Sequence, residues 1–152
     1  MVGLNADGAS LGRTMTDISL ALWATNVAPR LNGLPAWLAR IVEALLEQIR
    51  PGAKVKEVAL YGRALCKQYG AESNQMAEKW PHFGHGVGLF FEKPYIGPEM
   101  CTDEDTFEEG MAFGIEAFYG RANLGSTGFE QNILVTKAGI ELLTRTPMIW
   151  WD

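Results

Sequence analysis

The sequence predicts an α+β fold, with a largely antiparallel sheet and two helices packed on one of its faces. Three observations support this prediction. Short extended segments come first, two stretches with apolar residues at helical spacing follow, and glycine-spaced or apolar extended segments fill the second half. The order strands, helices, strands is typical of α+β domains, whereas a parallel α/β sheet needs strands and helices that alternate along the chain.

Length and charge restrict the class of protein. The chain has 152 residues, of which 47% are hydrophobic and 20% charged, as in an ordinary globular domain. It has 13 basic and 18 acidic residues and a net charge of −5. We therefore expect no nucleic-acid partner and no membrane partner, because both need clustered Lys and Arg.

The cysteines and the N-terminus indicate a cellular compartment. Two cysteines are too few for a disulfide framework or a closed thiolate zinc site. The N-terminus lacks the basic and apolar regions of a signal peptide. No apolar stretch reaches the roughly 20 residues that cross a bilayer. We expect a cytoplasmic protein with reduced thiols.

The first half of the chain predicts two strands and two helices. Residues 2–6 and 18–23 are short apolar runs typical of strands. Over 35–49, and again over 55–69, apolar residues repeat at helical spacing. A proline in the first turn of the first stretch, and a Pro-Gly pair after it, agree with helix boundaries at these places.

The second half predicts strands. Residues 82–91 are glycine-spaced and read as extended, and 111–119, 128–136 and 140–145 are apolar runs separated by turn residues. Together with the two early strands, they supply the sheet that the helices would cover.

Two glutamates interrupt these predicted strands. Glu116 lies in one apolar segment and Glu130 in the next. A carboxylate buried in a strand is costly unless it is paired or binds a metal. With His85 in the glycine-rich strand, they suggest a shared site, and Asp7 and Asp17 are further acidic candidates near strand ends. Spacing alone fits solvent-facing side chains as well, so it leaves a metal site open.

Three ordered motifs resemble the pita-bread metallohydrolases, a superfamily that includes methionine aminopeptidase, aminopeptidase P, prolidase and creatinase. They are Gly-His-Gly-Val-Gly-Leu at 84–89, followed by Glu-x-Pro, the segment 109–116, and the segment 129–136 with its closing strand at 139–144. The resemblance implies a partial pita-bread fold with a curved, mostly antiparallel sheet. Because the family's catalytic domain has an additional half upstream, residues 1–152 are expected to form a single, N-terminally shortened catalytic domain.

The resemblance also implies five metal ligands. The segments around Asp7 and Asp17 are similar to the hairpin that carries the family's two aspartates, although their separation is one residue shorter than is common. His85, Glu116 and Glu130 match the other three ligand positions. Four carboxylates and one imidazole suit two divalent ions such as Mn, Co, Fe or Zn. Such a pair activates a bridging water and polarises a carbonyl.

One departure from the family pattern concerns the catalytic residues. Family peptidases place another histidine shortly after the Gly-His-Gly block, where this chain has Phe91 or Glu92, depending on a one-residue gap. Glu92 is a candidate general acid or base. His82 is a candidate substitute for the missing histidine. A solvated Glu92 and a structural His82 are the alternatives.

Three functions follow from the resemblance. The first is a metal-dependent hydrolase similar to Xaa-Pro aminopeptidase or dipeptidase, acting on a short-peptide or other small-molecule substrate. The second is an enzyme similar to the family's dimethylsulfoniopropionate lyase, with the same site but a different reaction. The third is an inactive truncated domain or pseudoenzyme that binds a partner. Homodimers occur in the family, so a homodimer is a candidate assembly.

Overall fold

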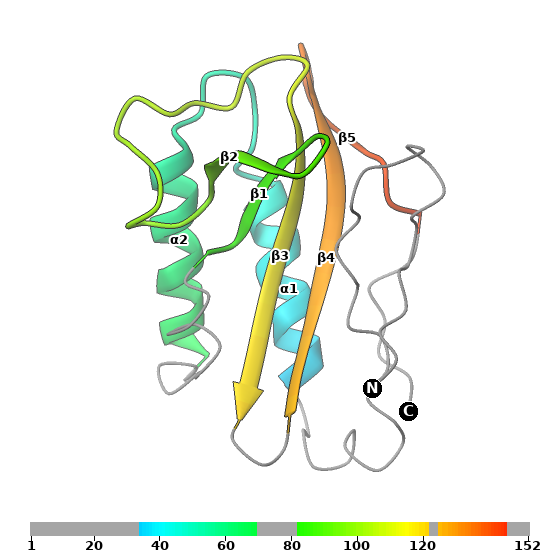
Figure 1. Ribbon diagram of the computed structural model, residues 1–152. Helices are drawn as coiled ribbons and strands as arrows, with labels where there is room; N and C mark the ends of the chain where they lie inside the picture. The colour runs from blue at the N-terminus through cyan, green and yellow to red at the C-terminus, as the bar shows by residue number, and fades with distance from the viewer. Residues whose placement is uncertain (1–33, 70–81, 122–124, 146–152) are drawn as a thin grey trace.

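The computed structural model describes residues 34–69, 82–121 and 125–145 (Figure 1). The strands expected at 2–6 and 18–23 lie outside these residues, and Asp7 and Asp17 lie outside them as well. The described elements are the helices α1 (Leu34–Leu46) and α2 (Val55–Gln68) and the strands β1 (Gly84–Val87), β2 (Phe91–Tyr95), β3 (Ala112–Arg121), β4 (Gly125–Thr136) and β5 (Gly139–Leu142).

The five strands form one sheet in the order β2-β1-β3-β4-β5, and every neighbouring pair is antiparallel. Helix α1 contacts β3 and β4, and α2 packs against α1, so both helices lie on the same side of the sheet (Figure 1). The predicted α+β fold with an antiparallel sheet is therefore confirmed. Neither of the described helices is long and apolar enough to cross a membrane.

Helix α1 forms along the apolar stripe that the sequence predicts. Its inward side chains are completely buried, at Leu38, Ile41, Val42 and Leu45. The regular helix ends at Leu46, earlier than predicted, because the N–H groups of Gln48 and Ile49 bond to carbonyls three residues back instead of four. Such tightening is common in the last turn of a helix. The stripe nevertheless continues, and Ile49 is buried.

One face of the sheet supplies the rest of the core. Alternate residues of β3 and β4 pack with the helices in one hydrophobic cluster, namely Phe113, Ile115, Ala117, Tyr119, Ile133 and Val135. Because successive side chains of a strand point to opposite faces, the residues between these point away from the helices. That second face carries the polar residues described below.

The segment 82–91, predicted as one extended stretch, is instead the start of a hairpin. Strand β1 ends at Val87, a turn follows, and β2 begins at Phe91. The pairing is irregular, since His85 lies opposite Tyr95 while its neighbour Gly86 lies opposite Glu92. The glycines that made the segment look uniformly extended also allow the turn and the irregularity.

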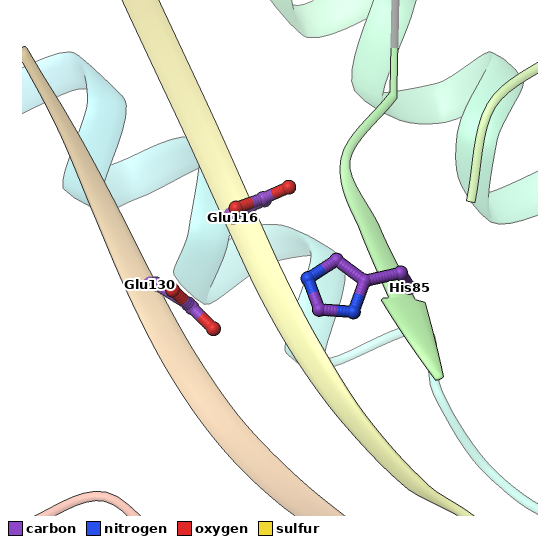
Figure 2. Close-up of side chains that lie close together, drawn as sticks. All are labelled: His85, Glu116 and Glu130. Atoms are coloured by element: carbon purple, nitrogen blue, oxygen red, sulfur yellow. The ribbon is translucent and has the colours of Figure 1, made fainter. Parts of the chain in front are cut away.

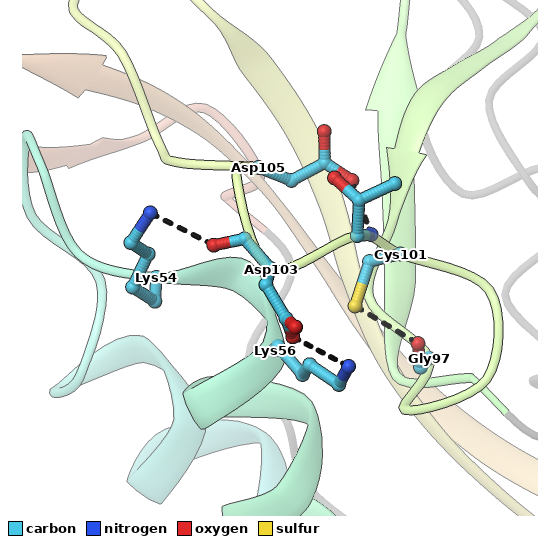
Figure 3. Close-up of polar contacts among 7 residues, drawn as sticks. Lys54, Lys56, Gly97, Cys101, Asp103 and Asp105 are labelled. Carbon is cyan, nitrogen blue, oxygen red and sulfur yellow. Dashed lines mark hydrogen bonds and ion pairs between the residues drawn. The ribbon is translucent and has the colours of Figure 1, made fainter.

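The connection between β2 and β3 is fastened to the start of α2 (Figure 3). Phe107 is completely buried, and its backbone exchanges hydrogen bonds with Gly52 and Ala53, at 2.8 and 3.0 Å. The Lys56 ammonium, 2.6 Å from Asp103, lowers the pKa of that carboxyl. The ion pair is exposed and contributes little to stability, so the buried Phe107 and its backbone bonds hold the connection in place.

Cys66 lies in α2 and packs against the core, and its burial raises the pKa of the thiol to about 11. Since the thiolate is the reactive form, we expect Cys66 to react slowly with a thiol reagent at neutral pH in the folded protein and quickly after unfolding. The Cys101→Ser variant makes Cys66 the single reporter. Equal rates for the folded and unfolded forms of that variant would contradict the burial of this thiol.

Candidate metal centre

Three of the predicted ligands come together on the sheet face away from the helices (Figure 2). His85 comes from β1, Glu116 from β3 and Glu130 from β4, and their ligand atoms all lie within 4.8 Å of one another. His85 and Glu116 are each only 2% exposed. Three neighbouring strands thus bring an imidazole and two carboxylates to one point.

Strand register explains this convergence. Glu116 lies directly opposite Glu130, and His85 lies opposite Gly114, which precedes Glu116 by two residues on the same face. Directly opposite residues of an antiparallel pair project from the same face of the sheet. The three side chains therefore share a face as soon as β1, β3 and β4 pair in this register.

Gly114 provides the space for the cluster. A Cβ at this position would lie 2.5 Å from Oε1 of Glu130 and 3.4 Å from Oδ1 of Asn132. The carboxylate of Glu130 therefore lies over the backbone of β3, where any other residue would place its side chain. The missing side chain at Gly114 is part of the site.

The tautomer of His85 fits a metal ligand. Its Nδ1 lies 2.9 Å from the carbonyl oxygen of Gly86, which can only accept a hydrogen bond. Nδ1 therefore carries the proton and donates it, which leaves the lone pair on Nε2. A hydrogen bond from the second ring nitrogen to a carbonyl is the usual way in which a ligand histidine is oriented.

His82 lies beside Glu116 and is also buried. Its Nδ1 is 3.1 Å from Oε1 of Glu116, and the backbone N–H of Gly84 donates to the same Nδ1 at 3.3 Å. A nitrogen that accepts from Gly84 has no proton to donate to Glu116, so the two contacts compete. His82 is thus the neighbour of a predicted ligand, and its catalytic role stays a prediction.

The residues present fit a divalent cation. Oε1 of Glu116 is buried, and while Nδ1 of His82 accepts from Gly84, this oxygen receives no hydrogen bond from any residue that the structure describes. A buried carboxylate oxygen in this state is costly, and the directly opposite carboxylate of Glu130 adds repulsion. A cation removes both costs, and a nitrogen and carboxylate oxygens are donors that Mn, Fe, Co and Zn accept.

Phe91, rather than Glu92, lies beside the cluster. The ring of Phe91 meets that of His85 edge-on, with centroids 4.4 Å apart. Glu92 is exposed and lies opposite Gly86, one residue out of phase with His85. The alternation of the strand therefore turns Glu92 to the other face of the hairpin. Its acid–base role stays a prediction that this placement does not favour.

Two residues of the site were missed from the sequence. Gly114 lies two residues before Glu116, and Asn132 lies two residues after Glu130. The period of a strand puts each of them on the same face as its predicted ligand. That two-residue offset is the signal that would have found them.

A polar His–Glu cluster on one face of an open antiparallel sheet, with helices on the other face, defines a candidate metalloenzyme domain. Comparison with known proteins gives the family. The chain belongs to metallopeptidase family M24, whose family model matches residues 7–137. This range includes all five predicted ligands, those outside the described residues as well.

Individual relatives agree with the family. The putative dipeptidase YkvY of Bacillus subtilis is 25% identical over 142 residues, which are 92% of this chain and 37% of that protein. The Xaa-Pro dipeptidase of Pyrococcus furiosus is 34% identical over 103 residues, which are 66% of this chain and 27% of that protein. The chain thus spans about a third of the length of these relatives.

A solved structure confirms the fold. Prolidase from Pyrococcus furiosus superposes with a TM-score of 0.67 at 28% identity, over 78% of this chain and 33% of that one. The resemblance to the pita-bread metallohydrolases and the partial form of that fold are therefore confirmed.

Proposed function

We propose that this protein is a metal-dependent hydrolase that cleaves short peptides of the Xaa-Pro type, with two divalent cations at its centre. The observation that carries the proposal is the convergence of His85, Glu116 and Glu130, whose ligand atoms lie within 4.8 Å of one another. Membership of family M24 and relatives named as dipeptidases support the choice of reaction.

Each ligand has a proposed role. Asp7 and Asp17 would complete the set, and Glu130 would be the carboxylate shared by the two ions. When bound, the cations make a hydroxide available near neutral pH and polarise the substrate carbonyl. His85 and Glu116 are buried on paired strands, so their donor atoms are held in place before a substrate arrives.

Hydrolysis of a Xaa-Pro dipeptide with added Mn²⁺, Co²⁺ or Zn²⁺ tests this proposal. We expect turnover that depends on the metal, stops with a chelator and is lost in Glu116→Gln, which keeps the size of the side chain but not its charge. Metal binding is measured on the same samples. If the protein binds these ions saturably but none of them supports turnover, the peptidase proposal is rejected, whereas the proposal of a metal centre stands.

A lyase reaction at the same centre is the second candidate, favoured by the position of Phe91. Its phenyl ring occupies the place beside His85 and can neither accept nor donate a proton. A proton-transferring histidine for peptide hydrolysis is therefore not supplied at this place. Release of dimethyl sulfide from dimethylsulfoniopropionate by the metal-loaded protein would establish this reaction, and its absence under conditions of full metal loading would remove it.

A domain that only binds a partner is the third candidate. Native mass spectrometry measures the number of ions per chain and the number of chains per particle in one experiment. Two ions per chain would argue against the non-enzyme, and a two-chain particle would establish the proposed homodimer. The proposed cytoplasmic location and the proposed single catalytic domain over residues 1–152 need tests of their own, because mass spectrometry measures neither of them.

A further inference from the structure

Asn132 is a buried polar residue that the proposed mechanism does not use. It lies on β4 and is 9% exposed, and its Oδ1 has no hydrogen bond to any described residue. Its backbone, in contrast, is fixed, because its N–H donates to Oγ1 of Thr144 at 2.7 Å and its carbonyl accepts from Leu143 at 2.8 Å. A buried amide oxygen without a donor is costly and calls for a reason.

The position of this oxygen relates it to the metal cluster. His85, Gly114 and Asn132 lie opposite one another on three adjacent strands, next to the pair formed by Glu116 and Glu130. Because Gly114 has no side chain, the carboxylate of Glu130 extends into the gap between His85 and Asn132. Oδ1 of Asn132 and Oε1 of Glu130 lie 3.4 and 2.5 Å from the same point in that gap, where a Cβ of Gly114 would be.

A cation that binds Oε1 of Glu130 would also lie close to Oδ1 of Asn132, because both oxygens approach the same point. Oε1 of Glu130 carries part of a full negative charge, and Oδ1 is the negative end of an amide dipole. A cation is attracted by both. An amide oxygen is also a good ligand for hard cations, and it adds a donor without adding another negative charge to a buried site.

We propose that Oδ1 of Asn132 is an additional oxygen ligand, direct or through one water, of the cation held by His85, Glu116 and Glu130. This inference rests on the proposed metal centre. It also predicts a preference: the hard amide oxygen strengthens binding of Mn²⁺ more than binding of Zn²⁺, which accepts softer and fewer donors.

Calorimetric titration of the metal-free protein with Mn²⁺ alone, and then with Zn²⁺ alone, tests the inference. Leucine matches the size of asparagine and has no polar side-chain atom. In Asn132→Leu we expect Mn²⁺ affinity to fall about 10–100-fold and Zn²⁺ affinity to fall less. The melting temperature of the metal-free variant should be unchanged or higher, because an unsatisfied buried oxygen has been removed.

Gln131→Leu is the matched control. Gln131 is a buried carboxamide on the same strand, and strand alternation turns it to the helix side. The Gln131→Leu variant should bind Mn²⁺ and Zn²⁺ with the affinities of the unmodified protein. A fall in Mn²⁺ affinity of the same size in both variants would mean that β4 itself has been disturbed, and it would overturn the inference.

Asn132→Asp separates an oxygen ligand from a hydrogen-bond donor. The aspartate keeps the oxygen, so Mn²⁺ affinity should be equal or higher. If the amide nitrogen instead donates to Glu130, the aspartate loses that donor and affinity falls, which overturns the inference. Unchanged affinity in Asn132→Leu also overturns it. If the unmodified protein binds neither ion, the metal centre fails along with it, a result distinct from failure at Asn132 alone.

Discussion

Replacing Glu130 with glutamine is expected to weaken binding of divalent metal at least about 100-fold, beyond the range typical of groups that only support a ligand. Glutamine keeps the size of the side chain and one oxygen, but it removes the charge. Metal ligands of this type must be deprotonated carboxylates, and Glu130 faces the directly opposite Glu116. Titration of the metal-free variant with Mn²⁺ measures the loss.

The same substitution is expected to have the opposite effect on the metal-free protein. Two carboxylates that lie directly opposite each other repel, so Glu130→Gln should leave the melting temperature unchanged or raise it. In the unmodified protein, Mn²⁺ at about 100 times its dissociation constant should add about 2.7 kcal/mol, or about 5–10 °C for a chain of this length. The variant should gain almost nothing.

Glu141→Gln is the control for this prediction. Glu141 is an exposed glutamate on β5, which pairs with the strand β4 that carries Glu130. It is not part of the cluster. The Glu141→Gln variant should show the full stabilisation by Mn²⁺ and lose this stabilisation when a chelator is added. If Glu130→Gln were stabilised by Mn²⁺ as strongly as Glu141→Gln, the assignment of Glu130 as a ligand would be wrong.

Replacing Gly114 with alanine is expected to weaken metal binding about tenfold or more, the effect typical of a disturbed ligand orientation, without unfolding the sheet. The new Cβ would lie 2.5 Å from Oε1 of Glu130. That oxygen is at the far end of a flexible side chain, so the chain can relieve the contact by moving the carboxylate. The strand is kept and the ligand is displaced, which circular dichroism and Mn²⁺ titration measure separately.

Gly88→Ala is matched to this change. Its Cβ would also meet a glutamate side chain, 2.8 Å from Cγ of Glu92. Glu92 is exposed and lies on the other face of the hairpin from His85, so metal affinity should not change. Wild-type affinity in Gly114→Ala would show that the carboxylate of Glu130 does not need the space over Gly114.

The helices were the most predictable part of this fold. The spacing of Leu38, Ile41 and Leu45 repeats with the period of a helix, and the same residues are completely buried. Such a stripe is a local property, and it needs no knowledge of the rest of the chain. The last turn was less predictable. Its hydrogen bonds span three residues instead of four, and the chain that follows it bonds to Phe107, which is distant in the sequence.

The site was predictable in its residue types and not in its geometry. His85, Glu116 and Glu130 were identified from motifs, and the structure brings them together. Which of Phe91 and Glu92 faces them depends on the irregular pairing between β1 and β2. That irregularity is a relation between two strands, and a sequence does not state which residues of two strands lie opposite each other.

The separation between the two faces of the sheet has a consequence for how such a chain changes over time. Packing against the helices stabilises one side, whereas the proposed ligands occupy the other, where the carboxylates of Glu116 and Glu130 lie opposite each other. Mutations that delete a proposed ligand are therefore tolerated by the folding of the metal-free protein, and where metal is scarce, selection for a stable fold does not preserve the ligands. A descendant with the same backbone and no cations is an easily reached outcome, so solubility and a sharp melting curve say nothing about whether such a descendant is still an enzyme.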